Sequence, residues 1–164
     1  MVSLSLAELV STMLLFMLVF SILYLSFQLS IIRRVYIQEI KAKQMERTLK
    51  AIDLPPSVTR TMGEVFHRYY TGNVEEFFRD SKLANSLFTT LNTLDNLSAG
   101  ILSGAYNEEV AYTQLGNSLP KFYEIIQLFI YESRGDFSSA SQYIKLEQLA
   151  RRWSDKSPIR GSYD

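Results

Sequence analysis

The first long apolar segment of the chain begins close to its N-terminus. From Leu9 to Ile32 the sequence runs through 24 residues without a formal charge. At about 1.5 Å per residue, a helix of that length extends about 36 Å, enough to cross the roughly 30 Å hydrocarbon core of a bilayer. A secretory signal peptide is a poorer match, because the side-chain charge that precedes this segment is an anion, Glu8. We therefore predict a transmembrane helix over 9–32.

Basic residues follow the apolar segment at once. Six lysines and arginines lie between Arg33 and Lys50 against two glutamates, whereas residues 1–8 contain none. Because the basic flank of a membrane span stays on the cytoplasmic side, we predict a single-pass protein with residues 1–8 outside and the C-terminal part in the cytoplasm. The same cations suit the anionic headgroups of membrane lipids, which are expected partners.

Apolar residues continue at helical spacing beyond the span. Their steps of three to five predict a juxtamembrane helix over 33–54, which Pro55 and Pro56 end because proline lacks an N–H donor and disfavours helix in the residue before it. Four further segments are periodic: about 57–70, 81–103, 107–134 with an interruption at 116–120, and 139–153. The predicted fold is all-α: one transmembrane helix and a cytosolic domain over 55–153 of four to five packed helices, before a tail over 154–164.

The apolar positions of these helices define a predicted core. Two sets of residues lie at core spacing: Val58, Met62, Val65, Phe66 and Tyr69, then Leu83, Leu87, Leu91, Leu94, Leu97, Ile101 and Leu102. Gly104 is expected to make the turn after the second set, and Asn107 is expected to cap the helix that follows. Residues 74–80 are expected to add one or two helical turns.

Composition argues against catalysis and against broad binding of duplex nucleic acid. The 17 cations balance 17 anions, and because the juxtamembrane helix holds six of the cations, the cytosolic domain is mildly acidic. Cysteine is absent and His67 is the one histidine, so a thiolate zinc site or a histidine-based triad lacks its residues. Glu75 and Glu76, like Glu108 and Glu109, point about 100° apart on a helix and chelate poorly. We expect neither a cofactor nor an enzyme.

Polar residues near both ends of the span share one side of the predicted helix. This polar-ended face consists of Glu8, Thr12, Leu15, Val19, Ile22 and Ser26. If parallel copies turned it inward, it would line a narrow pore with an apolar constriction, a recognised gating element. The alternative is that the hydroxyls satisfy their own backbone. Ser21 and Gln28, about 160° away, favour helix association, because an amide that faces lipid is costly.

The cytosolic sequence resembles a bacterial protein family. The segments "LNTLDNLSAGILSGAYNEEV", "LPKFYEIIQLFIYESR" and "LEQLARRW" are similar to an uncharacterised family of small membrane-anchored helical proteins, recorded as a domain of unknown function and found among prophage and mobile genes. The resemblance covers about 65–153. Its anchors are Leu91, Asn92, Gly100, Gly104, Tyr106, Glu108, Arg134 and Trp153. The family pattern has an acidic residue near the first asparagine, a place that Asp95 or Asn96 fills here.

The layout of a short span on a small helical domain is also similar to the membrane effector of the Hailong antiphage system. That resemblance implies a homo-oligomeric channel, preferably a tetramer, in the bacterial inner membrane, where a deoxyadenylate signal from a companion nucleotidyltransferase gates it. The predicted function is therefore a ligand-gated ion channel or pore of antiphage defence. The alternative is a membrane-tethered interaction module, such as a prophage exclusion protein, that conducts nothing.

A nucleotide signal would need cations for its phosphates and a flat side chain for its base. Arg134 ends one long predicted helix, while Arg151 and Arg152 precede the one tryptophan, Trp153, in the next. If these two helices pack antiparallel, the four residues are predicted to bind a cyclic or linear oligoadenylate. The alternative is that Trp153 fills the core and the arginines are solvated or paired with Glu132 and Asp136.

Overall fold

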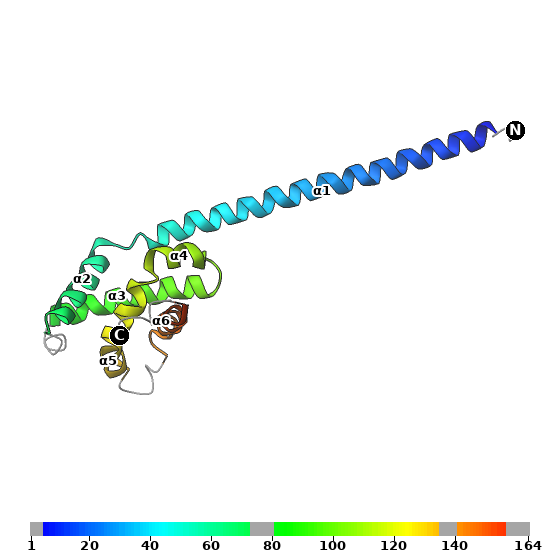
Figure 1. The fold of residues 1–164 in the computed structure, drawn as a ribbon. Coiled ribbons are helices and arrows are strands. Elements are labelled where there is room, and N and C mark those ends of the chain that lie inside the picture. Colours follow the sequence, from blue (N-terminus) through cyan, green and yellow to red (C-terminus); the bar gives the residue numbers. More distant parts are fainter. Residues whose placement is uncertain (1–4, 73–80, 135–140, 157–164) are drawn as a thin grey trace, which may run out of the picture. The chain divides into compact units, whose positions relative to one another are not determined.

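The computed structural model of this protein describes residues 5–72, 81–134 and 141–156. Over these residues it contains six helices and no strand, which confirms the predicted all-α class (Figure 1). The chain divides into two compact units, residues 1–43 and residues 44–164. The turns expected over 74–80, with Glu75 and Glu76, lie outside the described residues, as does most of the expected tail.

Helix α1 (Leu6–Ile52) contains the predicted span and continues without interruption through the basic segment. It starts with a reciprocal pair of hydrogen bonds: the Ser5 amide donates to the Glu8 carboxylate at 2.9 Å, and the Glu8 amide donates to the Ser5 hydroxyl at 3.4 Å. This capping box satisfies two of the amides that a helix start leaves free. Glu8 therefore has a structural role at the first turn of α1.

The apolar part of α1 is long enough to cross a membrane, and none of its side chains is buried within the chain. Phe16 and Phe20 are 77% and 72% exposed. A helix in the core of a water-soluble protein would instead bury its apolar face. Length, composition and exposure together make this segment a candidate membrane span.

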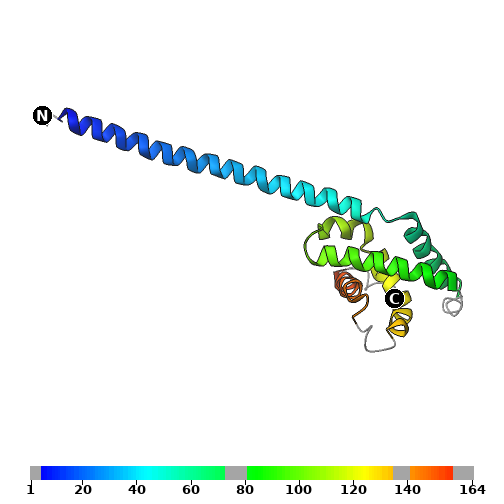
Figure 2. The ribbon, with the colours of Figure 1, turned by 180° about the vertical axis from the view of Figure 1, so that it is seen from behind.

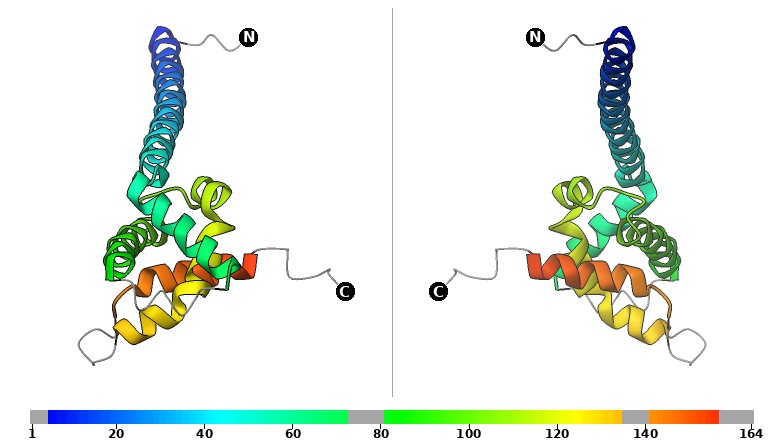
Figure 3. Two further views of the ribbon diagram at one scale, coloured as in Figure 1. Left: turned by 90° about the vertical axis from the view of Figure 1, so that its left-hand side faces the viewer. Right: turned by 90° about the vertical axis from the view of Figure 1, so that its right-hand side faces the viewer.

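The second unit, residues 44–164, is built from the end of α1 and five shorter helices. These are α2 (Pro56–Tyr70), α3 (Ser81–Leu102), α4 (Glu108–Leu115), α5 (Ser118–Ser133) and α6 (Ile144–Lys156). Pro56 occupies the first position of α2, where its missing N–H removes no helical hydrogen bond. Helix α4 lies along the second half of α3 (Figure 2), and α5 and α6 lie side by side (Figure 3).

Helix α3 supplies the centre of the core, because it packs on α2, α4 and α6. Its buried apolar residues are Leu83, Leu87, Leu91, Leu94, Leu97 and Ile101, all of them predicted from the spacing. Leu102 is only partly buried. The prediction for Tyr69 was wrong: it lies at the exposed end of α2, with 37% of its surface accessible, whereas Val58, Met62 and Val65 are buried as expected.

The last turns of α1 are part of this second unit. The side-chain amide of Gln44 donates to the Gly104 carbonyl at 2.7 Å. The hydroxyl of the fully buried Thr48 accepts from the backbone amide of Asn107 at 2.7 Å. Gly104 has a φ of +76°, a conformation that favours glycine. The Asn107 side chain accepts from the Val110 amide at 3.1 Å, which confirms the predicted cap. The turn between α3 and α4 thus receives the end of α1.

Helix α6 begins at Ile144, later than the predicted start at residue 139, for a conformational reason. Tyr143 has a φ of +59°, and a left-handed residue of this kind interrupts a right-handed helix. The first turn of α6 is then capped from α3, where the Asp95 carboxylate accepts from the Leu146 amide at 2.8 Å. Helix α5 also differs, since it starts at Ser118 and includes Pro120 in its first turn.

Candidate functional site

The predicted ligand residues separate into two clusters on α6. The first, the Glu147 cluster, consists of Arg134, Glu147 and Arg151. Arg134 Nη2 lies 2.9 Å from Glu147 Oε2, and Arg151 Nη2 lies 2.7 Å from Glu147 Oε1. The Arg134 Nε also donates to the Gln142 carbonyl at 2.9 Å. Of the four predicted ligand residues, the structure places Arg134 and Arg151 on the same carboxylate, and that carboxylate occupies the space between them.

Burial differs sharply within the Glu147 cluster. The side chains of Arg134 and Glu147 are 14% and 15% exposed, whereas Arg151 is 65% exposed. A charge in a mostly buried position requires a partner of opposite sign, because burial removes its hydration. Arg134 and Glu147 therefore form the internal pair, which joins the end of α5 to the start of α6, and Arg151 adds to it from the surface.

The second cluster, the Glu108 cluster, joins α4 to the end of α6. It consists of Glu108, Arg152, Trp153 and Lys156. Glu108 Oε1 accepts from Lys156 Nζ at 2.6 Å and from Trp153 Nε1 at 3.2 Å, while Arg152 Nη2 lies 2.9 Å from Oε2. Burial by itself would raise the pKa of Glu108, but the bonds from Lys156 and Trp153 outweigh it, so the pKa lies below its usual value.

Trp153 fills the core instead of presenting an open face. It is fully buried and packs edge-to-face on Tyr112, with ring centroids 5.4 Å apart. A base therefore cannot stack on this ring in the described conformation. Binding of an oligoadenylate by Arg134, Arg151, Arg152 and Trp153 stays a prediction, and the structure gives all four a role in holding α6.

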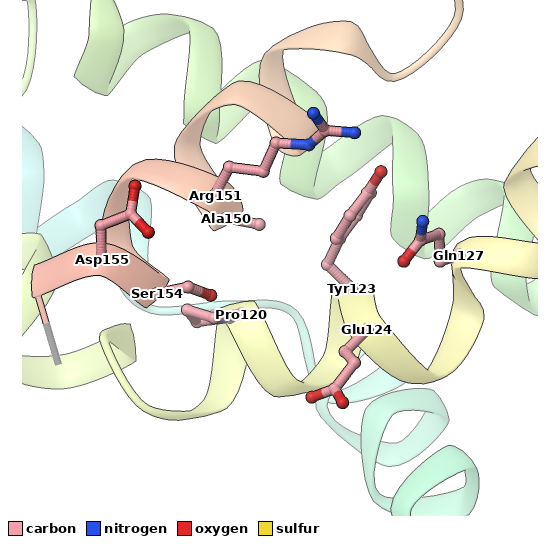
Figure 4. A pocket seen from close by; sticks show the side chains of 8 residues that line it. All are labelled: Pro120, Tyr123, Glu124, Gln127, Ala150, Arg151, Ser154 and Asp155. Carbon is pink, nitrogen blue, oxygen red and sulfur yellow. The ribbon is translucent and has the colours of Figure 1, made fainter. Parts of the chain in front are cut away.

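A shallow pocket of about 370 Å³ lies between α5 and α6 (Figure 4). It is lined by Pro120, Tyr123, Glu124, Gln127, Ala150, Arg151, Ser154 and Asp155. Arg151 is the one predicted ligand residue on its wall, and the wall also carries two acids. This mixed charge does not select for a polyanion.

Tyr123 is the buried polar residue of this pocket. Its hydroxyl makes no hydrogen bond within the described residues, although the Tyr131 hydroxyl is near enough to affect it. Burial, followed by the effects of Tyr131 and Glu147, raises the pKa of Tyr123 above its usual value. The phenol therefore stays neutral at physiological pH.

The polar-ended face of α1 is largely satisfied within its own helix. The Thr12 hydroxyl donates to the Glu8 carbonyl at 2.6 Å, and Ser11 donates to the same oxygen at 3.0 Å. Leu15, Val19 and Ile22 are exposed along the middle of this face, and Ser26 is exposed near its end. A role of these residues in lining a pore stays a prediction, because a pore requires further copies of the chain.

Sequence reasoning named Asp95 and Glu108 only as positions of the family resemblance and did not single out Glu147, so it missed the contacts of all three with α6. Asp95 and Glu147 hold α6 at its first turn, and Glu108 holds α6 near its end. Glu147 and Arg151 are four residues apart, which is the spacing of a helical ion pair and the one available signal. Asp95 and Glu108 meet residues 51 and 45 positions away, so local spacing does not reveal them.

Comparison with known proteins gives one match. A family model described as a domain of unknown function, DUF4760, matches residues 19–153. No curated protein and no solved structure matches the chain. The match begins inside the apolar segment of α1, so the family includes part of that helix together with the helical domain. This extends the resemblance seen over 65–153.

Proposed function

The chain belongs to the DUF4760 family, and we propose that it is a single-pass membrane protein that displays its helical domain at the cytoplasmic face as a self-associated interaction module. One observation carries this proposal. Helix α1 is a single helix of 47 residues, and its apolar segment leaves every side chain open. Lipid is the environment in which such a segment is stable.

The basic residues after the apolar segment support the orientation. Arg33 and Arg34 directly follow Ile32, and the cations of the next turns lie on an exposed helix. Cations at this position are attracted to the anionic lipids of the cytoplasmic leaflet, at about 1 kcal/mol for each lysine or arginine near the surface. We therefore assign residues 44–164 to the cytoplasm.

The internal pairing of the predicted ligand cations favours an interaction module over a nucleotide receptor. Arg134 and Arg152 contact Glu147 and Glu108, and a phosphate would have to displace those carboxylates to bind. Partner proteins need no such displacement, because they can contact exposed apolar residues such as Tyr70 and Leu128, which are 72% and 60% exposed.

A ligand-gated channel, preferably a tetramer, is the second candidate function. The observation in its favour is the polar-ended face, whose apolar middle residues Leu15, Val19 and Ile22 are free to meet other copies. In this account an oligoadenylate would bind the cytoplasmic domain and open the pore, so that ions cross the membrane of an infected cell.

Ion flux through proteoliposomes distinguishes the two candidates. The purified chain and a Val19→Asn variant are reconstituted, because a polar residue at the middle of the polar-ended face would hydrate an apolar constriction. The interaction module predicts flux equal to that of empty vesicles for both proteins, with and without oligoadenylates. Phe16→Asn, on another side of α1, is the matched control. A leak that is specific to Val19→Asn, or flux that an oligoadenylate induces, would contradict the module and favour the channel.

A further inference from the structure

A second face of α1 has the pattern of a coiled coil. Starting at Ser21, positions recur at alternating steps of three and four residues as far as the last turn. This heptad face consists of Ser21, Tyr24, Gln28, Ile31, Val35, Gln38, Ala42, Met45 and Leu49. It lies about 160° from the polar-ended face, and its register is continuous from the apolar segment into the basic one.

The part of the heptad face beyond the apolar segment is apolar and uncovered. Val35, Met45 and Leu49 are 57%, 47% and 49% exposed, and they follow the first arginines, where α1 enters water. About half of the surface of each of these side chains is thus open to solvent. Their burial against another helix would be favourable, because it removes apolar surface from water.

The charges beside this face specify a parallel pairing. Arg34 and Lys41 lie on one flank, and Glu39 and Glu46 lie on the other. In a parallel, in-register pair, each cation faces the acid five residues further along: Arg34 faces Glu39 of the partner subunit, and Lys41 faces Glu46 of the partner subunit. An antiparallel pair would place like charges together.

Within the described part of one chain, the acids of one flank form ion pairs and the cations of the other flank do not. Glu39 pairs with Lys43 at 2.6 Å and Glu46 with Lys50 at 2.8 Å, each within the helix. Arg34 and Lys41 have no ion-pair partner among the residues that the structure describes. A carboxylate can accept from two cations, so the intrahelical pairs leave Glu39 and Glu46 able to meet a second helix.

The polar-ended face of α1 is unsuited to pairing between copies outside the membrane. The polar-ended face continues through Arg33, Tyr36, Ile40, Lys43 and Arg47, so parallel copies joined along it would bring rows of like charge together. The heptad face continues through neutral residues alone. Because one straight helix presents one side to a bundle axis, this difference selects the heptad face.

We infer that α1 forms a parallel, in-register coiled coil with a second copy of this chain along the heptad face from Gln28 to Leu49. The inference rests on the proposed membrane anchor, since anchored copies meet in one orientation. It also explains the polar residue within the apolar segment: the Gln28 amide donates to the Tyr24 hydroxyl at 2.9 Å, and both side chains lie on the face that turns away from lipid.

Cysteine cross-linking tests the register, and the chain suits it because cysteine is absent from the sequence. Val35→Cys and Ala42→Cys place a thiol on the heptad face, whereas Ile40→Cys and Arg47→Cys place one on the opposite side. Each variant is oxidised in isolated membranes and separated without reductant. We expect dimers for Val35→Cys and Ala42→Cys and monomers for the other two.

The outcomes separate this inference from the membrane anchor. Cross-links at Ile40→Cys and Arg47→Cys in place of the expected pair, or no cross-link at any position in chains that stay in the membrane, would overturn the coiled coil alone. Release of the unmodified chain by alkaline carbonate would overturn the anchor. Neither result depends on a ligand.

A charge reversal provides an independent check of the parallel pairing. In the Ala42→Cys background, Lys41→Glu sets a second acid against Glu46 of the partner subunit, and we expect a severalfold lower dimer yield. Adding Glu46→Lys restores the opposite charges and should restore the yield. Equal yields in all three proteins would contradict the charge register.

Discussion

Replacing Trp153 with alanine is expected to destabilise the helical domain by about 3–5 kcal/mol, the usual loss for a large aromatic residue in a closed core. Trp153 is fully buried, packs on Tyr112 and donates to Glu108. The substitution removes these contacts together, and the cavity lies where α6 meets α4. Urea unfolding of the purified chain in detergent, followed by circular dichroism, measures the change.

The matched control is Leu128→Ala on α5. Leu128 is 60% exposed, so this change should alter stability by less than about 0.5 kcal/mol. A similar, small effect of both substitutions would contradict the placement of Trp153 in the core. The Trp153 ring would then lie at the surface, where it could stack on a base.

Replacing Glu147 with alanine is the second change with a large expected effect. Arg134 would then hold a mostly buried charge without its carboxylate, and breaking a buried pair in this way costs about 3–5 kcal/mol. The same urea unfolding, followed by Trp153 fluorescence, measures the loss. The domain is expected to loosen first at the junction between α5 and α6.

Two further variants assign this effect to the buried pair. Arg151→Ala removes the exposed partner of Glu147 and should lower stability far less than Glu147→Ala does, because water screens an exposed ion pair. The double variant Arg134→Met, Glu147→Leu removes both buried charges and should recover much of the stability lost in Glu147→Ala. Equal losses for Arg151→Ala and Glu147→Ala would contradict the assignment of Arg134 and Glu147 as the internal pair.

The sequence predicted the elements that depend on local spacing. The leucines of α3 recur at steps of three and four, and the Asn107 cap and the Gly104 turn are short-range features. The start of α6 was missed because a left-handed Tyr143 precedes it, and nothing in the neighbouring residues signals that conformation. The roles of Asp95 and Glu108 arise from contacts between helices that are distant in the sequence, so they required the structure.

The candidate sites on α1 also divide into features that the sequence pattern reveals and features that required the structure. Glu8 and Thr12 were predicted to line a pore because they are polar residues at one end of the span. Local hydrogen bonds at the start of α1 satisfy both side chains. The heptad face is less conspicuous, since Ala42 and Gln38 interrupt its apolar residues. Its significance follows from the length of α1 and the exposure of Val35 and Leu49, which the structure supplies.

A self-associated anchor would change what the helical domain can do. Two copies joined through α1 would hold their helical domains close together, and linked sites bind a multivalent partner more tightly than single sites do. Weak surface contacts by individual domains would then be sufficient for function. This consequence holds for the interaction module, and it needs no pore.

Cysteine labelling in spheroplasts tests the central claim most directly, namely that α1 crosses the membrane with residues 44–164 in the cytoplasm. Ser5→Cys places a thiol before α1, and Ser86→Cys places one on the exposed side of α3. A membrane-impermeant maleimide should label Ser5→Cys in intact spheroplasts and should label Ser86→Cys only after the membrane is permeabilised. Labelling of Ser86→Cys in intact spheroplasts, or protection of Ser5→Cys until permeabilisation, would contradict the account.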